Sequence, residues 1–460
     1  MTRTHDDNVR EDVRNLIHPY TPLHAVPPDG PLVIRRGDGV YVEDDRGRRY
    51  LEGVAGLWCT ALGFSEQRLV DAAIRQMREL PYYQLFSGRS NEPSIELSER
   101  LLGMTRHLGM DRALFANSGS EANDQAVKLI WYYFNAIGRP EKKKLIARER
   151  GYHGVTVMAA SLTGIPDVHK DFDLPIGRVL RTGCPSPYHA TRPGETDDQM
   201  VDRLIGDLRA LIEREGPDTI AAFFAEPVQG AGGVIVPPES YFPKLQALLR
   251  EHRILLVADE VITGFGRTGS MFGCDAFGIH PDLMTVAKAL SSAYLPISAT
   301  LVSREVYDGV LEGSRRNGAF AHGVTYAGHP VAAAVALEAL KIYEERDIVG
   351  HVRRVAPRFQ ARLEALRTHP MVAHHRGLGL IGALELVVDK AARTTPDAAA
   401  LAYLTNVLFA EGVIARPIRG ALAFSPPLII TDAQIDELFD KVGRALDRTA
   451  AHVGVAPRAS

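Results

Sequence analysis

The amino-acid sequence predicts an α/β protein with a large layered domain and a smaller second domain. Between about residues 67 and 329, amphipathic helical stretches alternate with short runs in which nearly every residue is apolar. Such runs are too short for helices and too apolar for half-exposed strands, so they are typical of buried strands in a mostly parallel central sheet. Beyond this region an Ala-rich helix is followed by further strands. A chain of 460 residues is also of ordinary length for two domains.

Residues 1–66 are expected to form an irregular N-terminal arm, rich in Pro and His over residues 1–30, and part of the small domain. Segment 33–53 contains Gly-Asp and Asp-Arg-Gly turns between β-prone residues, which predicts short strands. The large domain is expected over residues 67–329. Its predicted strands are RALFAN, KKLIARE, IAAFFAE, ILLVADEV and LMTVAKAL.

Residues 330–460 are expected to form the rest of the small domain. A long helix over 330–345 leads into two strand-containing segments, GLGLIGALELVV and LAFSPPLII, and a terminal helix is predicted over 432–450. Because strands and helices are both present, we expect this smaller unit to be α+β, built from the N-terminal and C-terminal segments together.

Composition and charge exclude several classes of protein. The formal net charge of −3 gives no broad attraction to nucleic acid or to an anionic membrane. The three cysteines, Cys59, Cys184 and Cys274, are too few and too scattered for a disulfide framework or a zinc site. The first residues are charged and lack the apolar core of a secretory signal. We therefore expect a cytoplasmic protein with no metal, nucleic-acid or membrane partner.

Charged residues close three successive buried strands of the large domain. IAAFFA ends in Glu226, ILLVA ends in Asp259, and LMTVA ends in Lys288. A charge at the end of an apolar strand is costly unless it is paired or used, and ligands in open α/β sheets bind at the carboxyl ends of strands. A solvated strand end explains any one of these residues, but it explains three in succession poorly.

A possible anion site follows the strand RALFAN. Asn117 to Ser120 form a predicted turn into a helix whose first turn holds Glu121. Gly119 permits close backbone approach, and the free N–H groups of a helix start favour an anion. The alternative is an ordinary serine N-cap with a glutamate in the first turn.

Two glycine patterns match the dinucleotide fingerprint G-x-G-x-x-G, at residues 264–269 and 377–382. The fingerprint requires a preceding strand and a helix that opens directly after it. The first pattern is followed by SMFGCDAFG, which is not a helix start, and the second runs into the strand ALELVV. An NAD-dependent dehydrogenase is therefore the alternative from another class, and the sequence does not favour it.

The ordered motifs resemble those of class III aminotransferases, which have the fold-type I architecture and use pyridoxal phosphate (PLP). The resemblance covers about residues 15–450. The motifs that carry it are NSGSEAND, GYHG, AEPVQG, DEVITGFGRTG and VAKAL, in this order.

The resemblance implies that Lys288 carries PLP covalently and later moves the proton between the substrate and the cofactor. A lysine suits both tasks because burial can hold its amine neutral, and a neutral amine is a nucleophile and a base. Asp259 would face the pyridine nitrogen and keep it protonated. Tyr152 and Val261 would lie on the two faces of the ring.

The remaining cofactor contacts are also implied by the resemblance. The phosphate would be held at the helix start, and Thr325 in HGVTYAGHP would reach the phosphate of the other subunit, which implies a homodimer or a dimer of dimers with shared active sites. The implied cofactor-binding residues are Ser118, Gly119, Ser120, Tyr152, His153, Glu226, Asp259, Val261, Lys288 and Thr325.

An arginine that binds a substrate carboxylate is expected near VIARPIRG. The resemblance favours Arg416 for this role, with Arg419 as a rival, and either one could instead be a surface residue. A guanidinium can bind a carboxylate through two hydrogen bonds, and its flexible stem lets it move away for an amine that lacks a carboxylate.

Ornithine-type and γ-aminobutyrate-type relatives usually carry Glu after the QG of EPxQG, whereas this chain has Ala231. This departure favours a small keto acid such as pyruvate.

Aromatic and apolar residues predict a pocket for an amine donor. The resemblance to amine:pyruvate aminotransferases places Leu57 and Trp58 in the pocket wall with Tyr20 and Phe86, although a lone Trp is often a core residue. Phe320 and Ala321 are expected to line the same pocket from the neighbouring subunit.

The function implied by the resemblance is transfer of an amino group from an amine or ω-amino acid to a small keto acid, most simply pyruvate. The mechanism would be ping-pong, through pyridoxamine phosphate. Two alternatives with the same cofactor stay open, namely a glutamate-semialdehyde-type aminomutase and a dialkylglycine-type decarboxylase. The setting of Trp58 and Arg416 favours transamination over both.

Overall fold

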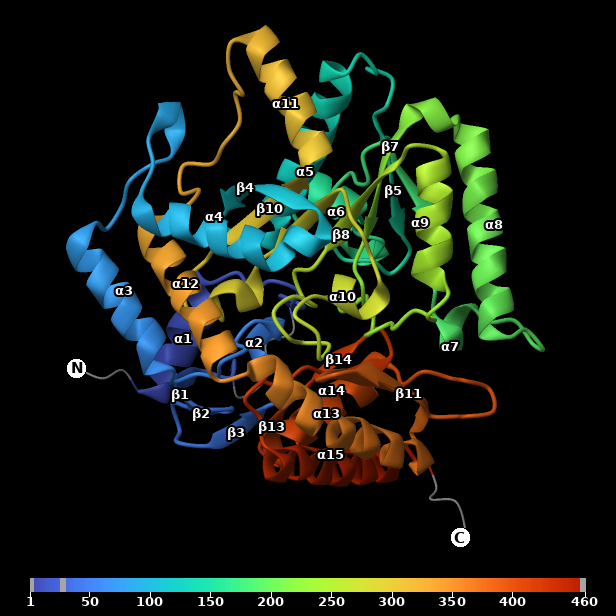
Figure 1. Ribbon diagram of the computed structural model, residues 1–460. Helices are drawn as coiled ribbons and strands as arrows, with labels where there is room; N and C mark the ends of the chain where they lie inside the picture. Colours follow the sequence, from blue (N-terminus) through green and yellow to red (C-terminus); the bar gives the residue numbers. More distant parts are fainter. Residues whose placement is uncertain (1–3, 25–29, 456–460) are drawn as a thin grey trace.

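A seven-stranded sheet forms the centre of the larger part of the molecule in the computed structural model, which describes residues 4–24 and 30–455 (Figure 1). The strand order is β4-β10-β9-β8-β7-β5-β6. β10 runs antiparallel to β9 and β4, and the other neighbouring strands run parallel. The strands are β4 (Met110–Ala116), β5 (Lys144–Arg148), β6 (Val179–Thr182), β7 (Ile220–Ala225), β8 (Leu255–Asp259), β9 (Leu283–Val286) and β10 (Ser298–Ser303).

Helices cover both faces of this sheet, so its central strands β7, β8 and β9 are buried along their whole length. In β7, Phe223 belongs to a core cluster with residues of α8 and α9, whereas Phe224 belongs to a second cluster with residues of α5. Successive side chains of a strand point to opposite faces, which explains this division. The helices are α3 (Gln67–Glu79), α4 (Glu92–Thr105), α5 (Gly119–Ala136), α6 (Val157–Leu162), α7 (Pro187–Ala190), α8 (Asp197–Glu215), α9 (Tyr241–Glu251), α10 (Gly273–Phe277), α11 (Arg304–Asn317) and α12 (Pro330–Glu345).

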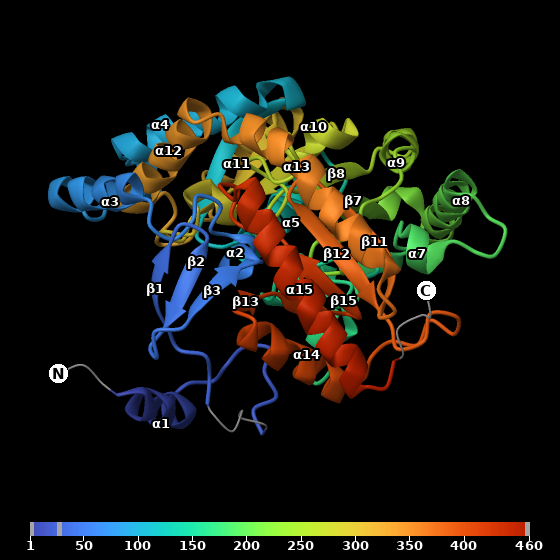
Figure 2. The same cartoon turned by 90° about the horizontal axis from the view of Figure 1, so that it is seen from below.

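The smaller part of the molecule combines the two ends of the chain, as the view from below shows (Figure 2). One sheet has the order β1-β2-β3-β13, in which Leu51 of β3 is paired in parallel with Val413 of β13. A second sheet has the order β11-β12-β15-β14. The elements are β1 (Ile34–Asp38), β2 (Tyr41–Asp44), β3 (Arg49–Glu52), β11 (Val372–Leu378), β12 (Ile381–Leu386), β13 (Val413–Ile414), β14 (Arg416–Ile418), β15 (Ala421–Phe424), α13 (Ile348–Ala365), α14 (Ala398–Ala410) and α15 (Asp432–His452).

The N-terminal arm is less irregular than expected, because it contains the helix α1 (His5–Asn15). Thr4 and Asp7 form a reciprocal capping box at its start, which satisfies N–H groups that would otherwise lack partners. Because no residue of α1 is buried, its sequence needs no apolar face, and the periodicity that would predict a helix is absent. Part of the expected arm, residues 25–29, lies outside the described residues.

Within the described ranges, no helix has the length and apolar character needed to cross a lipid bilayer.

Candidate active site

A cavity of about 740 Å³ lies at the carboxyl ends of β8 and β9 and at the start of α5. Asp259 is the last residue of β8, and Lys288 comes two residues after β9. The hairpin formed by β14 and β15 closes another side of the cavity with Arg416 and Arg419. The cavity therefore lies where the large sheet meets the C-terminal part of the chain.

Lys288 opens a short 3-10 helix, η5 (Lys288–Ser291), and has a positive φ of 46°. Such a backbone conformation is unfavourable for a residue with a side chain and is often found at functional sites. Its side chain lines the cavity and is half-buried by the surrounding protein. This burial lowers the pKa of the Lys288 amine, which favours the neutral, nucleophilic form.

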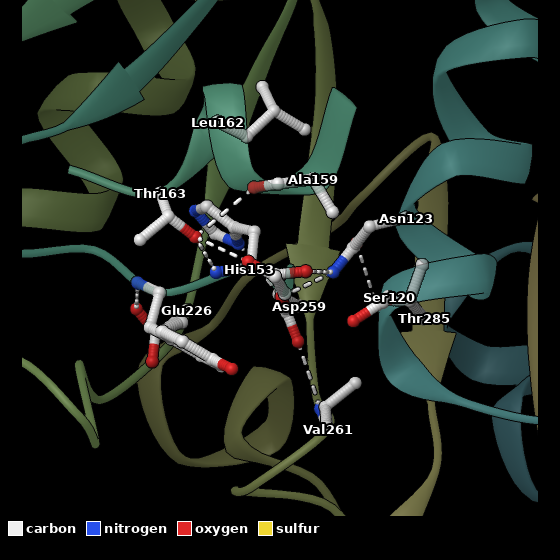
Figure 3. Close-up of polar contacts among 12 residues, drawn as sticks. Ser120, Asn123, His153, Ala159, Leu162, Thr163, Glu226, Asp259, Val261 and Thr285 are labelled. Atoms are coloured by element: carbon white, nitrogen blue, oxygen red, sulfur yellow. Dashed lines mark hydrogen bonds and ion pairs between the residues drawn. The ribbon is translucent and has the colours of Figure 1, made fainter. Parts of the chain in front are cut away.

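Three donors converge on the carboxylate of Asp259 (Figure 3). The Asn123 side-chain amide donates to Oδ2 at 2.9 Å, and His153 Nδ1 contacts the same oxygen at 2.8 Å. The backbone N–H of Val261 donates to Oδ1 at 3.1 Å. A carboxylate has about four acceptor sites, so these donors orient Asp259 and still leave it able to accept from a ring N–H group in the cavity.

The orienting residues are themselves held in place. Asn123 Oδ1 accepts from the Thr285 hydroxyl at 3.1 Å, and the backbone N–H of His153 donates to the Thr163 hydroxyl at 2.9 Å. Asn123, His153 and Thr285 are almost completely buried. The sequence does not indicate a role for Asn123, although it is the fifth residue of α5, three residues after Ser120.

Glu226 joins two loops around the cavity. Its carboxylate accepts from the backbone N–H of Tyr152 at 2.9 Å and from that of Gly230 at 3.0 Å. Burial raises the pKa of Glu226, and the nearby His153 opposes this shift. Glu226 therefore positions the loop of Tyr152 and the turn that begins at Gly230.

The start of α5 forms a closely packed cradle. Ser118 is the N-cap and accepts from the Glu121 N–H, and the Ser120 hydroxyl accepts from the Val155 N–H at 3.1 Å. A Cβ at Gly119 would lie 3.0 Å from Val261, and a Cβ at Gly154 would lie 2.4 Å from the Ser120 hydroxyl. Glycines are therefore needed for the turn to approach the cavity, where helix N–H groups favour a phosphate.

Tyr20, Leu57 and Trp58 lie together with Arg416 on the cavity wall, as the sequence predicts. Trp58 is 3% exposed, and its ring packs on Gly230, where a Cβ would lie 3.1 Å from the indole. Burial raises the pKa of Tyr152, and a hydrogen bond with Tyr20 adds to the shift. The substrate side is thus mostly apolar and aromatic.

Arg416 is available for an anionic ligand, whereas Arg419 is already paired. Among the described residues, no carboxylate forms an ion pair with Arg416. Ala231 lines the cavity at the position where ornithine-type and γ-aminobutyrate-type relatives usually carry Glu. Arg419 Nη2 donates to Asp167 Oδ2 at 2.7 Å. Arg416 therefore has no carboxylate partner among the described residues and Arg419 has one, while the binding of a substrate carboxylate by Arg416 stays a prediction.

Four predicted residues do not line this cavity within the same chain. Phe86, Phe320 and Ala321 instead surround a second cavity of about 530 Å³. Thr325 is exposed, and its carbonyl accepts from the Tyr82 hydroxyl at 2.7 Å. Phe320, Ala321 and Thr325 were expected to act from a neighbouring subunit, and Phe86 was expected to line the pocket for the amine donor. These roles stay predictions.

The comparison with known protein families decides the identity of this site. The profile of the class-III aminotransferases matches residues 25–446, which include every element that lines the cavity except the segment of Tyr20. The chain is a class-III aminotransferase. It has the fold-type I architecture, with PLP as its cofactor.

The aminotransferase is similar to plant γ-aminobutyrate transaminases. It is 49% identical to the mitochondrial γ-aminobutyrate transaminase 1 of Solanum lycopersicum over 97% of this chain and 87% of that protein. It is 50% identical to a probable mitochondrial γ-aminobutyrate transaminase 3 of Oryza sativa subsp. indica, over 92% of this chain and 83% of the relative.

Solved ω-transaminases share its structure. A thermostable ω-transaminase mutant from Pseudomonas jessenii has a TM-score of 0.95 and 47% identity, over 97% of this chain and 99% of that one. The enzyme from the same organism in complex with PMP has the same score and identity, over 98% and 99%. A variant engineered for asymmetric synthesis of enantiopure bulky amines scores 0.95 with 47% identity, over 97% and 100%.

The residues present fit PLP. The Lys288 amine can bond to the carbonyl carbon of the cofactor, Asp259 retains an acceptor site for the ring N–H, and the start of α5 offers N–H groups to the phosphate. When bound, PLP supplies a carbon that takes up the amino group and a ring that accepts the electrons released at the substrate carbon.

The chain's own residues perform the remaining work of the aminotransferase. The Lys288 amine, which burial keeps neutral by lowering its pKa, would take the proton from the substrate carbon and carry it to the cofactor side. Asp259 would supply a negative charge to the cofactor ring, and His153 and Asn123 orient its carboxylate. The enzyme thereby moves amino groups from amine or ω-amino acid donors to keto acids.

Proposed function

We propose that pyruvate is the preferred amino acceptor of this aminotransferase. Arg416 lines the cavity without an ion-pair partner among the described residues, and Ala231 supplies no carboxylate to hold it away from a substrate. A single free guanidinium matches a keto acid with one carboxylate. This availability of Arg416 is the observation that carries the proposal.

The proposed donor is an ω-amino acid or a primary amine with an apolar body. The carbon that carries its amino group has no carboxylate, so it can face the wall formed by Tyr20, Leu57 and Trp58. The plant relatives named as γ-aminobutyrate transaminases support the first donor type. The solved relative engineered for bulky amines supports the second type.

The two half-reactions can be tested separately with the purified holoenzyme. Addition of γ-aminobutyrate, β-alanine or 1-phenylethylamine without a keto acid should abolish the visible absorbance of the bound cofactor after a single turnover. Pyruvate should then restore the absorbance faster than 2-oxoglutarate does. Faster recovery with 2-oxoglutarate would overturn the proposed acceptor.

The same experiment separates transamination from the other two PLP reactions considered from the sequence. A decarboxylase of the dialkylglycine type would release carbon dioxide from a suitable amino acid. An aminomutase would complete a catalytic cycle without any external keto acid. Stoichiometric loss of the absorbance, with no gas and no isomerised product, is the outcome expected here.

A homodimer with shared active sites is also part of the proposal. Phe86, Phe320 and Ala321 form a separate cavity on the surface of one chain, and the nearby Tyr82 and Tyr326 are exposed aromatic residues. Exposed aromatic groups beside a hollow are typical of a surface that another protein covers. Light scattering should give a mass of twice 50.3 kDa, or a multiple of that dimer. A monomeric holoenzyme with full activity would contradict the shared site.

A cytoplasmic location completes the proposal and rests on the composition of the chain, in which apolar residues make up 45% and charged residues 24%. The plant relatives are named as mitochondrial enzymes, so this point needs its own measurement. Fractionation of the source cells, followed by detection of the protein in each fraction, tests it directly.

A further inference from the structure

Two arginines line the substrate side of the active-site cavity, but only one of them is free. Arg416 has no carboxylate partner among the described residues, whereas Arg419 Nη2 donates to Asp167 Oδ2 at 2.7 Å. Asp167 lines the same cavity and belongs to the short helix η3 (Pro166–Val168) of the large domain. The ion pair therefore joins two different parts of the molecule at the cavity.

The exposure of the two side chains shows where the Asp167–Arg419 ion pair lies relative to solvent. The Asp167 side chain is 81% exposed and the Arg419 side chain is 26% exposed. Asp167 thus reaches inward from the solvent side to an arginine that is more buried. An ion pair in such a setting is weak, because water screens the carboxylate.

The backbone fixes Arg419 at this place. Arg419 has a φ of 50° and lies with Gly420 in the turn between β14 and β15. The Arg150 side chain donates to the Arg419 carbonyl at 3.4 Å and to the Gly232 carbonyl at 3.0 Å. Arg150 thereby ties the hairpin turn to the turn that contains Ala231 and fixes the backbone from which the Arg419 side chain extends.

Arg416 and Arg419 both line the cavity, the first from β14 and the second from the turn that follows it. A substrate with two carboxylates could therefore place one carboxylate at each guanidinium. A carboxylate on Arg419 would, however, meet the position that Asp167 already occupies.

We propose that Asp167 acts as an internal substitute for a second substrate carboxylate, so that it neutralises Arg419 and disfavours dicarboxylate acceptors. The selectivity for a monocarboxylate then has two parts. Arg416 binds the single carboxylate of the acceptor, and Asp167 makes a second arginine unavailable. The proposal deepens the proposed function and rests on its preference for pyruvate over 2-oxoglutarate.

The test compares diacid with monoacid in the holoenzyme. Glutarate and butyrate are measured as inhibitors against pyruvate, and kcat/KM is measured for pyruvate and 2-oxoglutarate. In Asp167→Asn, the inhibition constant of glutarate should fall by about fivefold relative to that of butyrate. The ratio of kcat/KM for 2-oxoglutarate over pyruvate should rise by a similar factor.

Three further variants separate the pairing from other effects. Asp171→Asn removes the same charge from an exposed position on the same segment, outside the cavity lining, and should retain the wild-type ratios. Asp167→Glu keeps a carboxylate and should restore the ratios toward wild type. Arg419→Gln added to Asp167→Asn should abolish the gain for glutarate.

Each result has a definite meaning. If Asp167→Asn changes glutarate and butyrate binding equally, or if Asp171→Asn gives the same gain, Asp167 has no role in selectivity and the inference is wrong. If the wild-type enzyme already uses 2-oxoglutarate as well as pyruvate, the proposed acceptor is wrong instead. The two failures are therefore distinguishable in one set of measurements.

Discussion

The Asp259 carboxylate supplies a negative charge to the site and also accepts several hydrogen bonds from the protein. Both of its oxygens accept hydrogen bonds from the protein, from Asn123 and His153 on one side and from the Val261 N–H on the other. A neutral amide cannot accept on both sides, because one of its terminal atoms carries two hydrogens. Substitution therefore affects the charge and the local structure together.

We expect Asp259→Asn to lower the rate of the amine half-reaction on the order of a hundredfold or more, because the charge that supports the cofactor ring is lost. It should also lower the free energy of unfolding of the apoprotein by about 1–3 kcal/mol through unsatisfied buried groups. Stopped-flow absorbance measures the first effect and urea unfolding the second. A variant with wild-type half-reaction rates would show that Asp259 does not act on the cofactor.

Glu52 is a second buried carboxylate, and its effect on stability depends on pH. It is 5% exposed, accepts from the Val54 N–H at 3.1 Å, and has its pKa raised by burial to about 7. Between pH 4.5 and 7 the folded protein binds more protons at Glu52 than the unfolded chain does. The free energy of unfolding therefore falls as the pH rises through this range.

Glu52→Gln should remove this penalty. At pH 8 we expect the variant to be more stable than the wild-type apoprotein by about 2–3 kcal/mol, and at pH 4 we expect no difference. Urea unfolding at both pH values measures the change. An equal difference at the two pH values would mean that the amide acts through packing and not through the charge.

At the scale of elements, the site depends on how closely the loop of Gly154 approaches the start of α5. Gly154 has a φ of 127°, and a Cβ there would lie 2.4 Å from the Ser120 hydroxyl and 2.8 Å from the Ser120 Cα. One of the two backbones would have to move. The phosphate cradle is therefore defined by the contact between two segments and not by the helix start alone.

Gly154→Ala should weaken PLP binding by about tenfold or more, because it displaces Ser120 and strains the loop. Gly138→Ala is a matched control, since Gly138 also has a positive φ of 76° but would place its Cβ in open space. Titration of both apoproteins with PLP, followed by absorbance, gives the affinities. Equal losses in the two variants would assign the effect to backbone strain in general.

At the scale of the whole molecule, the two ends of the chain share one sheet. The Leu51 N–H donates to the Gly412 carbonyl at 2.9 Å, and the Gly53 N–H donates to the Ile414 carbonyl at 2.8 Å. Val413 is completely buried at this junction. The wall that carries Leu57 and Trp58 therefore follows directly from a strand that the C-terminal segment holds.

We expect Val413→Ala to lower the free energy of unfolding by about 1–3 kcal/mol through lost packing. The effect should reach the distant partner, so that the amides of Leu51 and Gly53 exchange faster with solvent deuterium. Hydrogen exchange followed by mass spectrometry measures both segments at once. Loss of protection only around residue 413 would show that the two ends are not coupled.

The large domain was predictable because its signals are local. An apolar run that ends in Asp259 or Lys288 identifies a buried strand and its functional end within a few residues of sequence. β10 gave no such signal, since its Ser298 and Thr300 are buried polar residues that donate to carbonyls near the start of α5. These polar side chains can be buried because the start of α5 supplies their hydrogen-bond acceptors, which the sequence of β10 alone does not show.

The candidate site was predictable where a residue is part of a motif and less so where a distant segment decides its role. Asn123 and Asp167 gain their partners from segments far away in the sequence, so neither was recognised beforehand. Phe86 and Thr325 lie outside the main cavity of their own chain, so the site roles expected for them stay predictions.

The pairing of β3 with β13 has a consequence for how the protein is made. The first strands leave the ribosome about 360 residues before the strand that completes their sheet. Until then the N-terminal strands have an open edge, which other chains can pair with. Folding of the catalytic wall must therefore wait until translation is almost finished, and a truncated product cannot assemble the substrate side of the pocket. Such late closure between distant segments is also expected to make refolding slow.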